Sequence, residues 1–149
     1  MSQSLVKILV HIVFSTKNRA DLILPEIEKE LYSYIHGIIE NSGAKLVIAN
    51  GTANHSHFLV SIGRNEVGIL IGNIKRDSSR WIKKKGSQYA DFYWQRGYGG
   101  FSIGQSQVKD VFKYIADQKE HHEEQSYEDE FRALCRKYDV EMDERYCWD

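Results

Sequence analysis

The fold is decided by residues 45–62, KLVIANGTANHSHFLVSI, in which two runs of strand-forming residues flank a short polar connection. We predict strands over 45–50 and 56–62 that pair as a β-hairpin. Successive strand residues point to opposite faces of a sheet, so His55 and His57 share one face, and the apolar residues that follow at alternate positions share the other. The hairpin therefore presents two imidazoles side by side.

The rest of the chain alternates between strand and helix patterns around this hairpin. An apolar, β-branched run predicts an early strand, and Pro25 stands where a helix can begin without losing a hydrogen bond. The expected elements are a strand over 5–14, a helix over 25–43, the two hairpin strands, a helix between Asn65 and Gly86, a short strand at 92–94 or 101–103, a helix from Ser106 and a last helix over 127–138.

This order of elements, βαββαβα, predicts an α+β fold of the ferredoxin-like or RRM-like split βαβ type. Such a fold is an antiparallel sheet with helices packed on one face. We expect the other face to be available for a ligand or a partner subunit.

Length and charge limit the classes of protein that fit. A chain of 149 residues with 42% hydrophobic residues and one proline fits a single domain, 1–149, with a sizeable core. Residues 1–116 hold 15 Lys+Arg and 9 Asp+Glu, whereas residues 117–149, expected to be helical, hold 5 and 12. The body is therefore basic and the C-terminal segment acidic. A basic body favours a polyanionic partner bound in a salt-sensitive way, and the balanced total argues against a histone-like coating protein.

The cysteines and the first apolar run bear on the cell compartment. Cys135 and Cys147 are too few for a disulfide or metal framework, so we expect reduced thiols and a cytoplasmic protein. Lys7 and His11 interrupt the apolar run over 5–14. We therefore expect neither a signal peptide nor a membrane span there.

A tyrosine and a glutamine four residues apart form a second candidate site. Tyr114 and Gln118 lie in the helix expected from residue 106, where this spacing places them one turn apart on the same side. Both fall at the edge of the apolar stripe. A phenol and an amide oxygen can then approach one metal ion. With His55 and His57 they supply the groups that metal-assisted cutting of a phosphodiester by a protein nucleophile requires.

Four ordered segments carry a resemblance to a known family. They are HIVFSTK (11–17), GTANHSHFLV (51–60), WQRGYGGFS (94–102) and YIADQKEHH (114–122). At these segments the chain resembles the single-tyrosine HUH transposases of the insertion-sequence 200/605 type. In that family the residue between the histidines is usually hydrophobic, whereas here it is Ser56. Because this residue faces away from the histidines, we expect a small packing loss rather than a lost ligand.

The resemblance implies an enzyme that cuts and rejoins single-stranded DNA at insertion-sequence ends through a 5′-phosphotyrosine intermediate. It implies that Tyr114 is the nucleophile and that His55, His57 and Gln118 hold a divalent metal. Mixed nitrogen and oxygen ligands suit Mg²⁺ or Mn²⁺. The resemblance further implies DNA hairpins near the element ends as partners. It also implies a homodimer in which the tyrosine helix of one subunit can serve the histidines of the other.

Basic and aromatic residues are candidates for DNA contacts. Cationic side chains bind the phosphate backbone, and aromatic rings stack on unpaired bases. The candidates for backbone contacts are Lys17, Arg19, Lys75, Arg76, Arg80, Lys83, Lys84 and Lys85, and those for stacking are Tyr93, Trp94 and Tyr98. The lysine run 83–85 is equally compatible with a solvated helix end.

Other interpretations remain open from the residues alone. A non-catalytic or domesticated single-strand-binding or regulatory protein would bind DNA without metal and without cutting it. An unrelated metallohydrolase would use the histidine pair to activate water and would leave no protein–DNA linkage. His121 and His122 are further candidate metal ligands, although a solvated helix end is their plainer interpretation.

Overall fold

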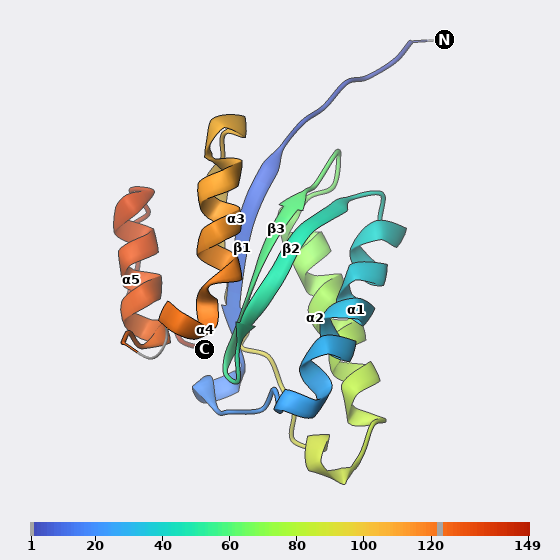
Figure 1. Ribbon diagram of the computed structural model, residues 1–149, viewed down its shortest axis with the longest axis vertical. Helices are drawn as coiled ribbons and strands as arrows, with labels where there is room; N and C mark the ends of the chain where they lie inside the picture. The colour runs from blue at the N-terminus through green and yellow to red at the C-terminus, as the bar shows by residue number, and fades with distance from the viewer. Residues whose placement is uncertain (1, 122–123) are drawn as a thin grey trace.

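The computed structural model describes residues 2–121 and 124–149, and the sheet at its centre has four antiparallel strands (Figure 1). The strands are β1 (Leu9–Ser15), β2 (Lys45–Thr52), β3 (His55–Ser61) and β4 (Gly99–Ile103), in the order β2-β3-β1-β4. β2 and β3 form the expected hairpin, and β1 pairs with both β3 and β4. The α+β fold class is confirmed.

The helices and 3-10 turns connect these strands. The α-helices are α1 (Pro25–Asn41), α2 (Val67–Lys83), α3 (Val108–Ala116), α4 (Gln118–His121) and α5 (Tyr127–Lys137). The 3-10 turns are η1 (Lys17–Arg19), η2 (Ser87–Tyr89) and η3 (Gln105–Gln107). Within the described residues, every helix is too short or too polar to cross a lipid bilayer.

Helices α1 and α2 cover one face of the sheet. The strand residues that point to them are apolar, among them Ile12 and Phe14 of β1 and Phe58 and Val60 of β3, and all four are buried. The helices contribute buried residues at helical spacing: Ile27, Leu31, Ile35 and Ile39 from α1 and Leu70, Ile71, Ile74 and Ile82 from α2. This face is the large hydrophobic core that strand alternation predicts.

The residue between the two histidines belongs to this face. Ser56 is fully buried, and its hydroxyl lies 2.9 Å from the hydroxyl of Tyr32 on α1. Ser56 thus lacks the packing of a hydrophobic residue but gains a hydrogen bond with Tyr32. We had expected only a small packing loss at this position.

The expectation that the helices lie on one face is incomplete, because α3, α4 and α5 cover the opposite face (Figure 1). The strands bear apolar residues on that face too, such as Leu9 and Val13 of β1 and Leu59 of β3. These residues pack against α3 and α5, including Val111, Ile115, Phe131 and Leu134. A strand that is apolar on both faces needs cover on both faces.

The helix expected from residue 106 is divided into shorter pieces. η3 precedes α3, and Asp117, with φ −94° and ψ 16°, separates α3 from α4. The short strand, which we predicted at 92–94 or at 101–103, is β4 and includes 101–103. Trp94 forms only an isolated bridge with Thr16. Tyr114 and Gln118 consequently lie on two successive helices rather than on one.

Candidate active site

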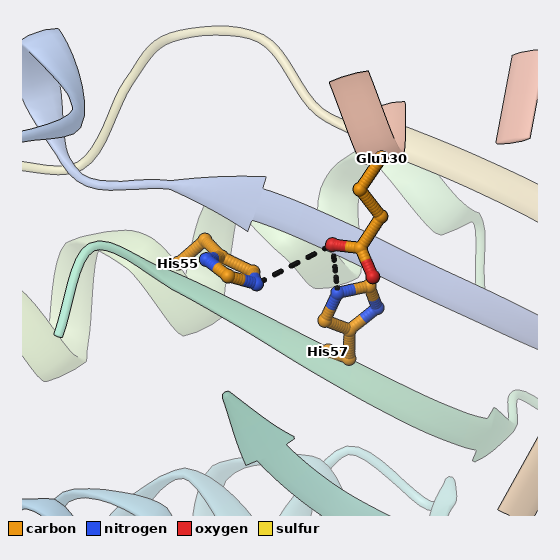
Figure 2. Close-up of side chains that lie close together, drawn as sticks. All are labelled: His55, His57 and Glu130. Carbon is orange, nitrogen blue, oxygen red and sulfur yellow. Dashed lines mark hydrogen bonds and ion pairs between the residues drawn. The ribbon is translucent and has the colours of Figure 1, made fainter. Parts of the chain in front are cut away.

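The two histidines of β3 point toward one carboxylate of α5 (Figure 2). Nε2 of His57 lies 3.0 Å from Oε1 of Glu130, and Nε2 of His55 lies 3.4 Å from the same oxygen. Both imidazoles are 0% exposed and Glu130 is 1% exposed. Ligand atoms of the three residues lie within 4.8 Å of one another, so this cluster could hold a metal ion.

The other ring nitrogen of each histidine has a partner beside the sheet. Nδ1 of His55 lies 2.8 Å from Oδ1 of Asn54 and 2.9 Å from Oγ1 of Thr52. Nδ1 of His57 lies 2.8 Å from Nε2 of His11 on β1. These contacts at Nδ1 fix both rings with Nε2 toward the carboxylate. Imidazole ligands of metals are usually oriented in this way, through a hydrogen bond at the ring nitrogen that does not bind the metal.

The tyrosine and glutamine that the sequence singled out reach the same carboxylate. The hydroxyl of Tyr114 donates a hydrogen bond to Oε2 of Glu130, and Nε2 of Gln118 donates to that oxygen at 2.9 Å. Oε1 of Gln118 lies 3.0 Å from Nε2 of His55. The structure therefore brings Tyr114, Gln118, His55 and His57 together despite the break between α3 and α4.

Burial and charge set the protonation of this cluster. Burial raises the pKa of Tyr114 well above its ordinary value, and the negative charge of Glu130 and the hydrogen bond to it raise it further. Burial, together with the neighbouring His57, lowers the pKa of His11 to about 3. At neutral pH Tyr114 is therefore a phenol and His11 a neutral imidazole. A cation placed beside Glu130 would oppose the negative charge that disfavours the phenolate.

Sequence reasoning missed Glu130, which connects all of these groups. Segment 117–149 holds 12 acidic residues, and most lie on the surface. The available signal is the position of Glu130 within the buried stripe of α5, which also contains Tyr127, Phe131 and Leu134. A carboxylate inside an apolar helix stripe is rarely buried without a partner. The ring of Tyr127 from the same stripe lies over His55, with centroids 4.8 Å apart.

His121 and His122 are the two further candidate ligands. The ring of His121 is stacked on that of Tyr114, with centroids 4.9 Å apart and an interplanar angle of 28°. Its contact is thus with the phenol rather than with the His55–His57–Glu130 cluster. His122 lies outside the described residues.

Two of the predicted DNA-contact residues meet at an exposed aromatic ring. Nζ of Lys83 lies 3.8 Å from the centroid of Tyr93, and Nζ of Lys17 lies 5.7 Å from it. Tyr93 and Tyr98 are exposed, as stacking on bases requires. Trp94, by contrast, is buried against Phe14 and donates a hydrogen bond to Ser78. Its ring is not exposed for stacking on a base, so that prediction is wrong for Trp94.

Other predicted DNA-contact residues have partners within the chain. Nζ of Lys75 donates to the carbonyl oxygens of Gln95, Arg96 and Gly97 at 2.9, 3.1 and 2.7 Å, and burial lowers its pKa to about 8. This lysine therefore holds the loop before β4. Three others also have partners: Arg19 contacts the carbonyl oxygen of Trp148, Arg76 contacts Asp77, and Lys85 contacts Glu30. Arg80 lies on α2, and Lys84 is the residue after the end of that helix.

Comparison with known proteins identifies the family. Residues 4–118 match the family described as Transposase IS200 like. This match covers more than half of the chain, and the protein belongs to the IS200-like transposase family. The resemblance found in the sequence is thereby confirmed, and the protein is an enzyme of DNA cleavage and strand transfer. The match ends at Gln118, so Glu130 and α5 lie beyond it.

Two solved structures share the fold. A candidate transposase from Deinococcus radiodurans R1 has a TM-score of 0.61 and 18% identity, covering 79% of this chain and 98% of that one. A REP-associated tyrosine transposase bound to a REP hairpin has a TM-score of 0.62 and 14% identity, covering 82% of this chain and 74% of that one. At such identities the likeness shows the fold alone. No curated protein matches the chain.

Proposed function

We propose that this transposase cuts and rejoins single-stranded DNA at insertion-sequence ends through a covalent bond between a DNA 5′ phosphate and the hydroxyl of Tyr114. One observation carries the proposal: the phenol of Tyr114 and the imidazoles of His55 and His57 all meet at the carboxylate of Glu130. The nucleophile thus lies directly beside the groups suited to hold a cation.

We propose that the cofactor is Mg²⁺ or Mn²⁺, held by His55, His57 and Gln118 with Glu130 as an additional ligand. Two imidazole nitrogens with carboxylate and amide oxygens fit such an ion better than they fit a closed structural zinc site. When bound, the ion would polarise the scissile phosphodiester and offset the charge of Glu130.

The side chains account for the remaining chemistry. The hydroxyl of Tyr114 already donates to Oε2 of Glu130, so the carboxylate is placed to accept the phenolic proton. The phenolic oxygen then bonds to phosphorus as the bond from phosphorus to the DNA 3′ oxygen breaks. The leaving 3′ oxygen takes up the proton that Glu130 received, and the products are a 5′-phosphotyrosine and a free 3′ hydroxyl. Attack by another 3′ hydroxyl reverses the step and joins the strands without ATP.

The substrate would approach through a cavity beside the nucleophile. A cavity of about 330 Å³ lies between α3 and α5 and includes Tyr114 and Glu130 among its lining residues. Val111, Leu134 and Tyr138 give it apolar walls, which can pack against a sugar or a base.

We propose a hairpin near each element end as the specific partner. The REP-associated tyrosine transposase that shares this fold is bound to a REP hairpin. Lys17 and Lys83 around the ring of Tyr93 offer both backbone charge and a stacking surface. The other proposed backbone contacts are Arg19, Arg76, Arg80, Lys84 and Lys85, with Lys75 acting through the loop that it holds.

A homodimer and a cytoplasmic location remain predictions. In the chain described here, Tyr114 reaches the histidines of its own subunit through Glu130. Exchange of the tyrosine helix between subunits would place the same residues in the same roles.

The decisive experiment incubates the protein with labelled single-stranded oligonucleotides from both flanks of its own gene, with Mn²⁺ or with EDTA. We expect a denaturant-resistant protein–DNA band that requires Mn²⁺ and disappears in the Tyr114→Phe variant, while folding and DNA binding persist. Tyr146→Phe, which changes a tyrosine that is 66% exposed and lies outside this cavity, is the matched control and should retain the band.

The other outcomes identify the rival functions. Cleavage without a linked band would indicate a metallohydrolase. DNA binding that survives EDTA, without cleavage by the wild type, would indicate a non-catalytic binding protein. A band that persists in Tyr114→Phe would overturn the assignment of the nucleophile.

A further inference from the structure

We propose that His11 is a positioning residue of the metal site, which accepts a hydrogen bond from Nδ1 of His57 and so keeps the Nε2 lone pair of His57 toward the ion. This inference rests on the proposed function, because it requires a cation between His55 and His57. His11 acts on the ion through His57, and its side chain also lines the cavity beside Tyr114.

The sheet register places the two rings together. Val13 of β1 pairs with His57, and His11 pairs with Leu59, so His11 and His57 are diagonal neighbours on one face. Nε2 of His11 lies 2.8 Å from Nδ1 of His57, and the ring centroids are 5.0 Å apart. His11 is 2% exposed. Solvent therefore has little access to this hydrogen bond.

Aromatic neighbours hold the ring of His11 in this place. The ring of Phe101 on β4 lies 6.4 Å away at 68°, and that of Tyr114 lies 6.0 Å away at 69°. Both contacts are edge-to-face. The imidazole is thus fixed between a strand residue, the proposed ligand His57 and the proposed nucleophile.

The chemistry of imidazole gives the contact a direction. A neutral imidazole has one N–H and one lone pair, and a ring that binds metal through Nε2 must carry its proton on Nδ1. That N–H needs an acceptor when it is buried. Nε2 of His11 lies at hydrogen-bond distance from Nδ1 of His57. For His55 the corresponding atoms are oxygens of Asn54 and Thr52.

The direction of this hydrogen bond depends on which nitrogen of His57 carries the proton. Nε2 of His57 lies 3.0 Å from Oε1 of Glu130, and a proton on Nε2 would leave Nδ1 as an acceptor for His11. A cation bound at Nε2 of His57 would instead require the proton of His57 on Nδ1 and that of His11 on its own Nδ1, so the hydrogen bond between the rings would run in the opposite direction. Each ring keeps one proton. An imidazole can donate in the first state and accept in the second.

The test compares Mn²⁺ affinity by calorimetry in His11→Phe and His11→Gln. Phenylalanine keeps a ring but removes the acceptor, and we expect binding to weaken by about 10- to 100-fold. The amide of glutamine can accept or donate near the position of Nε2, so His11→Gln should bind Mn²⁺ within a few-fold of the wild type. His36→Phe, the same substitution on the exposed side of α1, is the matched control and should leave affinity unchanged.

A second measurement avoids variants that fail to fold. Nitrogen-15 NMR of histidine-labelled wild-type protein with Cd²⁺ as a diamagnetic probe should show His57 protonated at Nδ1 and His11 unprotonated at Nε2. Wild-type affinity in His11→Phe, or a proton on Nε2 of His57 in the Cd²⁺ form, would overturn the proposal. Failure of the proposed function is distinct, because it appears as Mn²⁺ binding by the wild type without a Tyr114 adduct.

Discussion

The two faces of the sheet are both buried, but by different kinds of side chain. Toward α1 and α2 the strands present large apolar side chains such as Phe14 and Phe58, and the packing there is mainly hydrophobic. Toward α3, α4 and α5 they present His11, His55 and His57, which are just as buried but are paired through hydrogen bonds. Apolar burial stabilises a fold, whereas burial of polar groups is tolerated only when they are paired.

This difference suggests a division of roles between the faces. The α1 and α2 face has the larger apolar cluster and supplies most of the hydrophobic stabilisation. The other face divides its apolar residues into two smaller clusters, one with α5 and one with α3. The proposed chemistry lies on this face, at the polar centre formed by His55, His57 and Glu130.

The largest effect that would test this division is on stability. Phe58 and Phe101 are strand phenylalanines that point to opposite faces, and both are buried. Phe58→Ala should lower the free energy of unfolding by about 3–5 kcal/mol, because its ring packs inside the main core against Phe14 and Tyr32. Phe101→Ala should cost less, since its ring is stacked on the partly exposed Tyr138. Urea denaturation measures both, and an equal or greater loss for Phe101→Ala would contradict the division.

A smaller effect is expected from removing the charge at the polar centre. Glu130→Gln keeps the shape of the side chain but replaces an ionised ligand by an amide, so Mn²⁺ affinity should fall by about 10-fold or more. Calorimetry with Mn²⁺ measures the change. Asp129→Asn, one residue away on the exposed side of α5, is the control. If the two variants bind Mn²⁺ equally well, Glu130 is not a ligand.

Sequence reasoning performed differently on the two faces for a physical reason. Strand alternation and helical spacing are local patterns, so the hairpin, α1 and α2 could be predicted with their buried sides. The meeting of Tyr114 and Gln118 with the histidines followed from the family resemblance, because contacts between distant segments have no local signal. Glu130 lies beyond the matched part of the chain, and its one local signal, a place in the apolar stripe of α5, is obscured because segment 117–149 holds 12 acidic residues.

The second layer of helices was missed for a related reason. Four of the seven residues of β1 point to that face, and Leu9 and Val13 among them are apolar, but the histidine pair of β3 had suggested a face open to a ligand. In the structure His11 is paired with His57, and the backbone N–H of Ser15 donates to the side chain of Gln95. Pairing of polar groups across the fold allowed burial that composition alone does not predict.

The smallest expected effect concerns the hydrogen-bonded hydroxyls of Tyr32 and Ser56 on the α1 side of β3. Burial raises the pKa of Tyr32 above its ordinary value, while the phenol of an unfolded chain ionises near pH 10. Above about pH 10 the unfolded state therefore loses a proton that the folded state keeps, and stability falls by up to about 1.4 kcal/mol per pH unit for this group.

Tyr32→Phe removes both the hydrogen bond to Ser56 and this ionisation. At pH 7 the variant should be less stable than the wild type by about 1 kcal/mol. The difference should shrink as pH rises from 10 to 11, because only the wild type loses the contribution of Tyr32. Urea denaturation across pH 7 to 11 measures it. A difference in unfolding free energy that stays constant from pH 7 to 11 would mean that the core does not hold the Tyr32 hydroxyl in its neutral form.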